Sequence, residues 1–304
     1  MCRTFPFVMI IVLFITACSG ADMPAPTLTP ASSPTRAPTM TAPSLIREIK
    51  PETQTGTAYT VAWSPDGETL AVASGGEITL LSADLRESLT IFRPEGGALG
   101  VTWNPDMTHL ATVNGFRNPT ITVWDLDTAT AELTIAQEIQ ADSDQYGVSW
   151  SPDGKMLATR AGDSKSVIQI WDPAKWEKVH TFDLPYTKPR RALHWSADGA
   201  TVYGAGELGG KTIVFALNVA AGSVGEIGKY RLAEAELFDI SPDANRLAIS
   251  DPRGVIQIYD VVSGHVLTDI KSVEQPVDLA WNPNHMTLAV LDYKATLQLW
   301  DITQ

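Results

Sequence analysis

Residues 148–172, VSWSPDGKMLATRAGDSKSVIQIWD, decide the fold of this chain. An alternating run ends in Trp150, a Ser-Pro-Asp-Gly turn follows, and two further apolar runs end in Trp171 and Asp172. Alternation with a period of two predicts half-buried strands, and proline and glycine between the runs predict tight turns. The stretch therefore predicts three consecutive antiparallel strands.

The same unit is repeated six times between residue 58 and the C-terminus. Each copy has an anchor residue that ends its first run and a closing residue that ends its third run, 18 to 21 positions later. The anchors lie 40 to 47 residues apart and are Trp63, Trp103, Trp150, Trp195, Ile240 and Trp281. The closing residues are Leu81, Trp124, Trp171, Phe215, Tyr259 and Trp300. Strand-rich units with a period of about 40 to 45 residues are typical of propeller blades, so residues 44–304 predict an all-β, six-bladed β-propeller.

A fourth run follows in most copies and predicts the outer strand of each blade. It begins at Ser88, Glu132, Lys178, Glu226 and His265, and the sixth copy has none. The run SLIREIK at 44–50 has the same pattern, with no earlier run to pair with. We expect this N-terminal outer strand to pair with 297–301, so that the last blade is built from both ends of the domain and the ring closes.

Residues 1–17 have the composition of a signal peptide. Arg3 is their only charge, and the apolar run of 13 residues from Phe5 to Ala17 is too short to span a bilayer as a helix. Small residues precede Cys18, which resembles the lipobox of bacterial lipoproteins. The resemblance implies a lipid on Cys18 and a place at the cell membrane or cell surface, outside the cytoplasm. The alternative is an ordinary secretory signal with an incidental cysteine.

Residues 18–43 are expected to form the lipidated cysteine and a disordered tether. The segment 19–44 has six prolines, many Ser and Thr residues, and almost no charged or aromatic residues. This composition cannot bury enough apolar surface to fold, and it also suits O-glycosylation. Cys2 would leave with the signal peptide, so the mature chain would have no cysteine pair for a disulfide.

The WSPDG-type turns and the closing Trp-Asp pairs at 124–125, 171–172 and 300–301 resemble those of WD-repeat β-propellers. The resemblance covers residues 44–304 and implies a propeller that binds protein partners through its loops. The Gly-His pair that usually precedes the first strand of such repeats is missing from every copy. TolB-type propellers also use SPDG turns and are the nearest alternative.

The sequence contains no pattern that indicates a cofactor or a metal. The five histidines lack zinc-type spacing, and there is no nucleophile elbow. The glycine-rich run 204–210 is predicted as a loop between two strands, without the following helix that would bind phosphate. A net charge of −13 argues against nucleic-acid binding. Eight of the nine tryptophans are anchors or closing residues, which assigns them to the core rather than to a sugar-binding surface.

His194 and Asp239 occupy the same position in adjacent copies, one residue before the anchor. The other copies have Ala62, Thr102, Ser149 and Ala280 there. Side chains on neighbouring inner strands can face each other, so the two residues predict a structural pair between blades or part of a site. The site alternative is a lactonase-like propeller hydrolase with a metal in the central channel, which would need acidic and amide side chains from several blades.

The loops that join fourth to first strands and second to third strands share one rim, commonly the partner-binding face in WD-repeat propellers. Basic and aromatic residues there predict a surface for an acidic partner, with scattered solvated charge as the alternative. These rim residues are Phe116, Arg117, Arg160, Lys165, Tyr186, Lys188, Arg190 and Arg191. We therefore expect a monomeric, membrane-anchored interaction module or scaffold, with an unidentified protein partner, no cofactor and no catalytic activity.

Overall fold

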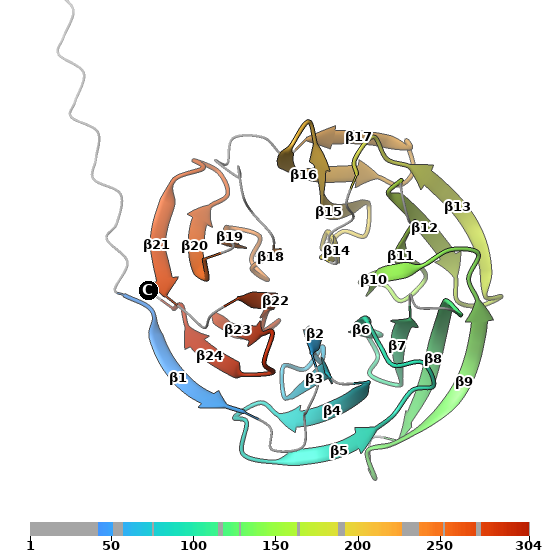
Figure 1. Ribbon diagram of the computed structural model, residues 1–304, viewed down its shortest axis with the longest axis horizontal. Coiled ribbons are helices and arrows are strands. Elements are labelled where there is room, and N and C mark those ends of the chain that lie inside the picture. The colour runs from blue at the N-terminus through green and yellow to red at the C-terminus, as the bar shows by residue number, and fades with distance from the viewer. Residues whose placement is uncertain are drawn as a thin grey trace, which may run out of the picture. The chain divides into compact units, whose positions relative to one another are not determined.

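Six four-stranded antiparallel sheets surround a common axis in the computed structural model of the chain (Figure 1). The structure describes residues 42–303, except 51–56, 75, 115–117, 128, 163–164, 188–191, 227–236, 252 and 272–274. These residues form 24 strands. Within this part of the chain there is no helix with the length and apolar character needed to cross a bilayer.

Each of the first five blades consists of four consecutive strands, ordered from the axis outward. Blade one contains β2 (Ala58–Trp63), β3 (Thr69–Ser74), β4 (Glu77–Ser82) and β5 (Ser88–Phe92). Blade two contains β6 (Gly100–Trp103), β7 (His109–Asn114), β8 (Thr120–Asp127) and β9 (Glu132–Gln140). Blade three contains β10 (Gln145–Trp150), β11 (Leu157–Ala161), β12 (Val167–Asp172) and β13 (Glu177–Asp183). Blade four contains β14 (Leu193–Trp195), β15 (Thr201–Leu208), β16 (Lys211–Asn218) and β17 (Ser223–Glu226). Blade five contains β18 (Leu237–Ile240), β19 (Arg246–Ser250), β20 (Val255–Asp260) and β21 (Val266–Lys271).

The sixth blade closes the ring with strands from both ends of the domain. It contains β22 (Pro276–Trp281), β23 (Thr287–Asp292), β24 (Leu297–Asp301) and the N-terminal β1 (Ser44–Ile49). β1 runs antiparallel to β24, from the pair Ser44 and Asp301 to the pair Ile49 and Leu297. The predicted closure of a six-bladed propeller by an N-terminal outer strand is confirmed.

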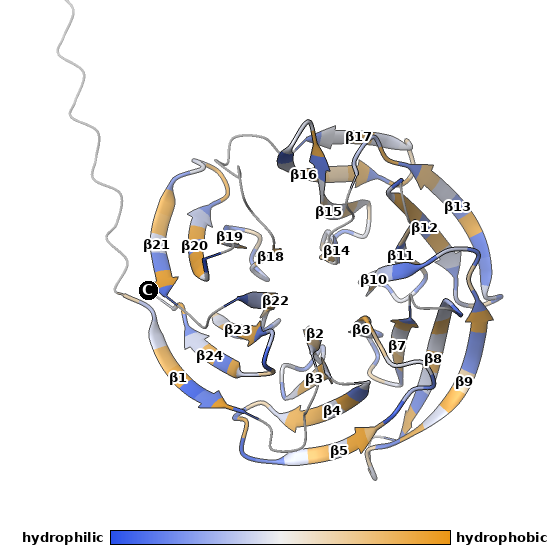
Figure 2. Cartoon of the chain, viewed as in Figure 1, coloured by the Kyte–Doolittle hydropathy of each residue, from blue (hydrophilic) through white to orange (hydrophobic). Residues whose placement is uncertain are grey.

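The apolar core lies between the blades. Six clusters of buried residues each join two adjacent blades, and the cluster between blades six and one includes Val72 and Leu299. Both faces of a middle strand are therefore covered, and every residue of β11 is buried. The outer strands are largely exposed, and polar and apolar residues are interspersed along β9 and β13 (Figure 2).

The Ser-x-Asp turns set the distance between the first two strands of a blade. In blade three, the Ser151 hydroxyl donates to Asp153 Oδ1 at 2.7 Å and accepts the Met156 N–H at 2.9 Å. Blades one, four and five repeat this arrangement at Ser64, Ser196 and Ser241. Because these hydrogen bonds lie within the turn itself, the turn has the same length and conformation in these four blades.

Two local predictions in blade four were wrong. The fourth strand was expected to begin at Glu226, but β17 already begins at Ser223, after a tight turn that follows Asn218; the rest of the predicted run, 227–230, lies outside the described residues. The glycine-rich run 204–210 was expected to be a loop, but residues 204–208 belong to β15 and only Gly209 and Gly210 form a turn.

Candidate functional site

The inner strands of all six blades line a central cavity of about 710 Å³. Its wall is mostly apolar. Among its described residues, the acidic side chains are Asp239 and Asp278, and the one imidazole is His194. A cavity of several hundred Å³ with an apolar wall and a few convergent polar groups is typical of small-molecule sites. The cavity is therefore the candidate site that the fold itself builds.

The structure brings His194 and Asp239 together, as their equivalent positions in the repeats predict. His194 Nδ1 lies 3.3 Å from Asp239 Oδ1. The same carboxylate accepts the N–H of Ile240 and, across the blade interface, the N–H of Trp281, both at 2.7 Å. Burial raises the pKa of Asp239, although His194 and the two N–H donors oppose that rise. One carboxylate thus connects blades four, five and six.

Asp278 makes the equivalent connection between blades six and one. Its Oδ2 accepts the Thr60 hydroxyl at 2.7 Å and the Val61 N–H at 2.9 Å, while its Oδ1 accepts the Leu279 N–H at 2.9 Å. Burial raises the pKa of Asp278 to about 6, against the lowering effects of these donors and of His194. Sequence reasoning missed this residue because it compared only the position next to the anchor, and Asp278 lies three residues before Trp281.

The raised pKa of Asp278 predicts a specific pH dependence of stability. A carboxyl whose pKa is higher in the folded chain stabilises the fold below its ordinary pKa, and this contribution is lost as pH rises through about 6. The shift corresponds to at most about 3 kcal/mol. The Asp278→Asn variant lacks this contribution at every pH. The unfolding free energy of the variant minus that of the unmodified protein should therefore increase between about pH 4 and pH 7, as the unmodified protein loses stability. Urea unfolding across that range measures it, and a constant difference would contradict the prediction.

Anchor tryptophans fasten neighbouring blades around the cavity. The indole Nε1 of an anchor donates to the backbone carbonyl that precedes the anchor of the previous blade, at 3.0 to 3.2 Å. The four pairs are Trp63 with Ala280, Trp103 with Ala62, Trp195 with Ser149, and Trp281 with Asp239. The fifth anchor tryptophan, Trp150, has no hydrogen-bond partner for Nε1 among the described residues.

Arg160 and Tyr186, both predicted on the exposed rim, are buried instead. Arg160 belongs to β11, has no exposed surface, donates to the Ser166 hydroxyl at 2.6 Å, and lies over the Phe215 ring at 5.4 Å. Tyr186 stacks on the same ring with centroids 5.1 Å apart. Their placement on the rim was wrong because both side chains fill the interface between blades three and four, where they are unavailable to a partner.

Two glycines of β15 make room for these side chains. A Cβ at Gly204 would lie 2.4 Å from Phe215 and 3.1 Å from Arg160 Nη1. A Cβ at Gly206 would lie 2.6 Å from the Tyr186 Cβ. The glycine-rich run therefore serves the packing of a large cation and two aromatic rings against the strand.

The other predicted site residues are placed only in part. Lys165 is exposed between β11 and β12, as predicted for the rim. Cys18 lies outside the described residues, as do the remaining rim residues, which are Phe116, Arg117, Lys188, Arg190 and Arg191. Their roles stay predictions.

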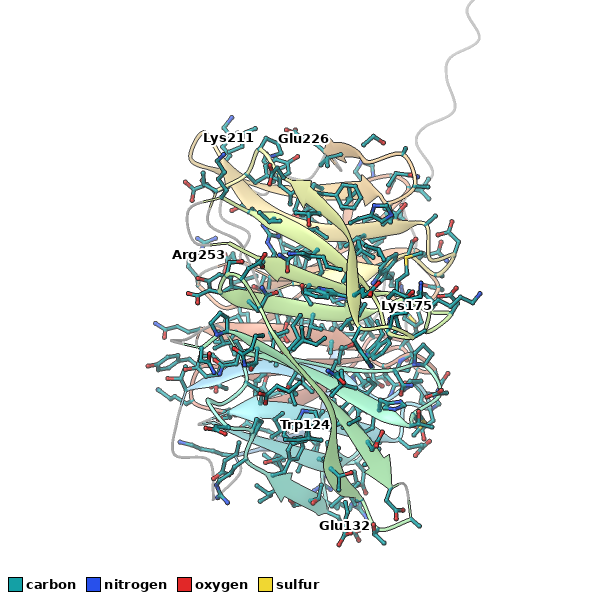
Figure 3. The ribbon with its side chains drawn as sticks, turned by 90° about the vertical axis from the view of Figure 1, so that its right-hand side faces the viewer. Trp124, Glu132, Lys175, Lys211, Glu226 and Arg253 are labelled. Atoms are coloured by element: carbon teal, nitrogen blue, oxygen red, sulfur yellow. The ribbon has the colours of Figure 1, made fainter. Side chains whose placement is uncertain are left out.

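One face of the propeller carries exposed aspartates from five blades, and we call it the acidic face. It is defined by exposed aspartates in the turns between first and second strands and between third and fourth strands. These are Asp66, Asp84, Asp106, Asp127, Asp153, Asp198 and Asp243. Arg86 and Lys155 in the same turns pair with Asp84 and Asp153. Hydrogen bonds from the Ser151 hydroxyl and then the Lys155 N–H lower the pKa of Asp153, and similar donors lower that of Asp198, so both stay ionised. Figure 3 shows Lys175 on this side of the molecule and Lys211 and Arg253 on the opposite side.

The hydrolase alternative needs a set of metal-binding side chains at the cavity. Among the described residues, no group of three or more His, Cys, Asp and Glu side chains has an arrangement that could hold a metal ion. The acidic side chains of the cavity wall are Asp239 and Asp278, and no Asn or Gln lines it in the described part of the chain.

Comparison with known protein families finds one similarity. Residues 76–205 match the family model described as eukaryotic translation initiation factor eIF2A. The matched stretch runs from the start of β4 in blade one into β15 of blade four. No curated protein matches the chain. The similarity thus falls on the propeller and does not include residues 1–43.

Proposed function

We propose that this chain is an extracytoplasmic protein-interaction module, held to a membrane by a lipid on Cys18, and that it acts by binding a partner without bond-making chemistry. The observation that carries the proposal is the acidic face, which turns of five blades build on a ring whose blades are tied to one another. Fixed charges on a rigid surface steer a partner of opposite charge and select against others. The partner class that fits is a protein with an exposed Lys- and Arg-rich segment.

This proposal changes the surface that the sequence favoured. Arg160 and Tyr186 of the predicted basic rim are buried, whereas the turn aspartates are exposed. The proposal keeps the interaction role and the membrane anchor. It exchanges an acidic partner for a basic one.

The acidic face can be neutralised without dismantling its turns. At Asp66, Asp153, Asp198 and Asp243 a Ser hydroxyl and the N–H two residues after the Asp donate to the Asp Oδ1. At Asp106 the donors to Oδ1 are the Asn104 amide and the N–H and hydroxyl of Thr108. An Asn side chain also provides this acceptor oxygen. The test variant therefore replaces Asp by Asn at 66, 106, 153, 198 and 243. The control removes five acidic charges elsewhere by the amide substitution at the exposed residues Glu95, Glu138, Asp183, Glu226 and Asp269.

We expect the unmodified chain and the control to capture the same partner from envelope extract, and the acidic-face variant to lose it. Capture should also weaken as salt is raised from about 0.05 M to about 0.5 M, because exposed charges are screened. Equal capture by the acidic-face variant would exclude the acidic face as the binding surface.

The membrane anchor gives a prediction with a matched control. Cys18→Ala should move the chain from the membrane fraction to the soluble fraction, because a lipid on that sulfur is the expected attachment. Cys2→Ala should leave the distribution unchanged, because Cys2 lies in the predicted signal peptide. Cell fractionation followed by immunoblotting measures both, and membrane retention of Cys18→Ala would refute the anchor.

A further inference from the structure

The charges in the wall of the central cavity do not balance. Asp239 and Asp278 line the cavity, and among its described lining residues there is no lysine or arginine to pair with them. His194 is the one imidazole of that wall. A carboxylate held away from bulk water is costly unless a cation lies close to it. Burial accordingly raises the pKa of both carboxyl groups.

Both carboxylates keep the capacity to accept another hydrogen bond. Within the described part of the chain, Asp278 Oδ1 accepts the Leu279 N–H at 2.9 Å, and Asp239 Oδ2 accepts the Trp281 N–H at 2.7 Å. No other donor to these two oxygens is found there. Because a carboxylate oxygen can accept two hydrogen bonds, each side chain has one acceptor position left.

Two nitrogens in the same wall also have unused hydrogen-bonding capacity. Trp150 Nε1 and His194 Nε2 are buried atoms without a partner among the described residues, and Trp150 as a whole is 9% exposed. The other four anchor tryptophans each donate to a carbonyl. A buried polar group without a partner is uncommon in folded proteins and is often explained by a bound species. Of these two atoms, His194 Nε2 can accept a hydrogen bond when the Nδ1–H faces Asp239, whereas the Trp150 N–H is a donor and does not bear on the binding of a cation.

We propose that the central cavity binds a small organic cation with a primary ammonium group, which donates hydrogen bonds to Asp239 and Asp278. An ammonium group has three donors and a full positive charge, which matches two carboxylates that have no lysine or arginine among the described residues of the wall, and only the His194 imidazole beside Asp239. The apolar wall, with the aromatic residues Trp63, Tyr146 and Tyr203, provides surface for the organic part of the ligand. The cavity is lined at one end by the first-turn residues Pro65, Pro152 and Pro242, which neighbour aspartates of the acidic face, whereas the two carboxylates of this site belong to the inner strands β18 and β22.

The test uses phenethylammonium and its neutral counterpart 2-phenylethanol as probes. Titration calorimetry on the full chain is run at about pH 7.5, above the pKa of Asp278, with Mg²⁺ and Ca²⁺ as separate titrants. The variants are Asp278→Asn and Asp239→Asn, which keep an acceptor oxygen but remove the charge. The control is Asp66→Asn with Asp153→Asn on the acidic face, which detects nonspecific binding to surface charge.

We expect phenethylammonium to bind the unmodified chain and the control alike, and both cavity variants to bind it about tenfold or more weakly, because a hydrogen bond to a charged group is lost. The alcohol should bind at least about tenfold more weakly than the ammonium. The Trp63 and Trp281 indole N–H resonances, which flank the two carboxylates, should shift on binding in a spectrum of the unmodified chain.

Several results would overturn the proposal. These are equal binding of ammonium and alcohol, equal loss in the acidic-face control, or preferential binding of Mg²⁺ or Ca²⁺. Absence of any binding by the unmodified chain would overturn it as well. The comparison of phenethylammonium with 2-phenylethanol uses unmodified protein, so it tests the proposed site even if a cavity variant fails to fold.

Discussion

Arg160→Ala should destabilise the propeller by about 2–5 kcal/mol, because removal of a large buried side chain leaves a cavity beside Phe215 and takes a hydrogen-bond donor from the Ser166 hydroxyl. Arg160 has no exposed surface, and its guanidinium lies between the Ser166 hydroxyl and the Phe215 ring. At about 2–4 °C for each kcal/mol in a domain of this size, the midpoint of thermal unfolding should fall by about 10 °C. Differential scanning calorimetry measures the change.

Lys165→Ala is the matched control for Arg160→Ala. Lys165 is a basic residue five positions further along the same blade, and it is exposed. Its replacement should change stability by no more than about 0.5 kcal/mol. Similar effects of the two substitutions would show that Arg160 does not hold the interface between blades three and four.

Deletion of residues 44–50 should be the most damaging change to the domain. It removes β1, leaves β24 as an open edge, and uncovers the core cluster between blades six and one, against which Ile49 packs. Ring closure protects the strand edges and the core between the blades of a propeller, so we expect the deletion to abolish cooperative unfolding or to make the chain aggregate. Circular dichroism on heating and size-exclusion chromatography detect both outcomes.

A circular permutant separates the role of β1 from the effect of shortening the chain. Ser44 pairs with Asp301, so a chain that begins at residue 57 and carries 44–50 after residue 304, through a short linker, can form the same strand pair as a hairpin. The permutant should recover stability to within about 1 kcal/mol of the unmodified domain. A deletion chain as stable as the permutant would show that ring closure does not need this strand.

Most of the fold could be predicted because each repeat carries its own local signals. The turn with Ser151 and Asp153 fastens itself through side chains two residues apart, and the anchor and closing aromatics follow at a nearly fixed distance. These contacts join residues that are close together in the chain, so the sequence pattern predicts them directly. Even the closure by β1 followed from a fourth run that lacked its own blade.

The burial of Arg160 could not be predicted in the same way. A middle strand of a propeller is covered on both faces, so the alternation that separates core from surface residues in other sheets carries no information there. The space for Arg160 is provided by Gly204 and Gly206, in the neighbouring blade. Only the register between blades brings those residues together, and a single sequence does not contain it.

The candidate site was predicted in part for the same reason. The pairing of His194 and Asp239 followed from equal positions in adjacent repeats, and the structure confirms their contact. Asp278 was missed because only the position next to the anchor was compared between repeats, and Asp278 lies three residues before Trp281, where the other repeats carry no acidic residue.

Crosslinking in the intact envelope tests the central claim that this chain binds a partner through the acidic face. A lysine-reactive crosslinker reaches the exposed Lys155 and Lys175 on that side and the exposed Lys211 on the other, as Figure 3 shows for Lys175 and Lys211. The proposed function predicts that one partner protein is joined to Lys155 and Lys175, through peptides next to its Lys- and Arg-rich segment. A partner joined to Lys211 alone, or no crosslinked partner at all, would contradict it.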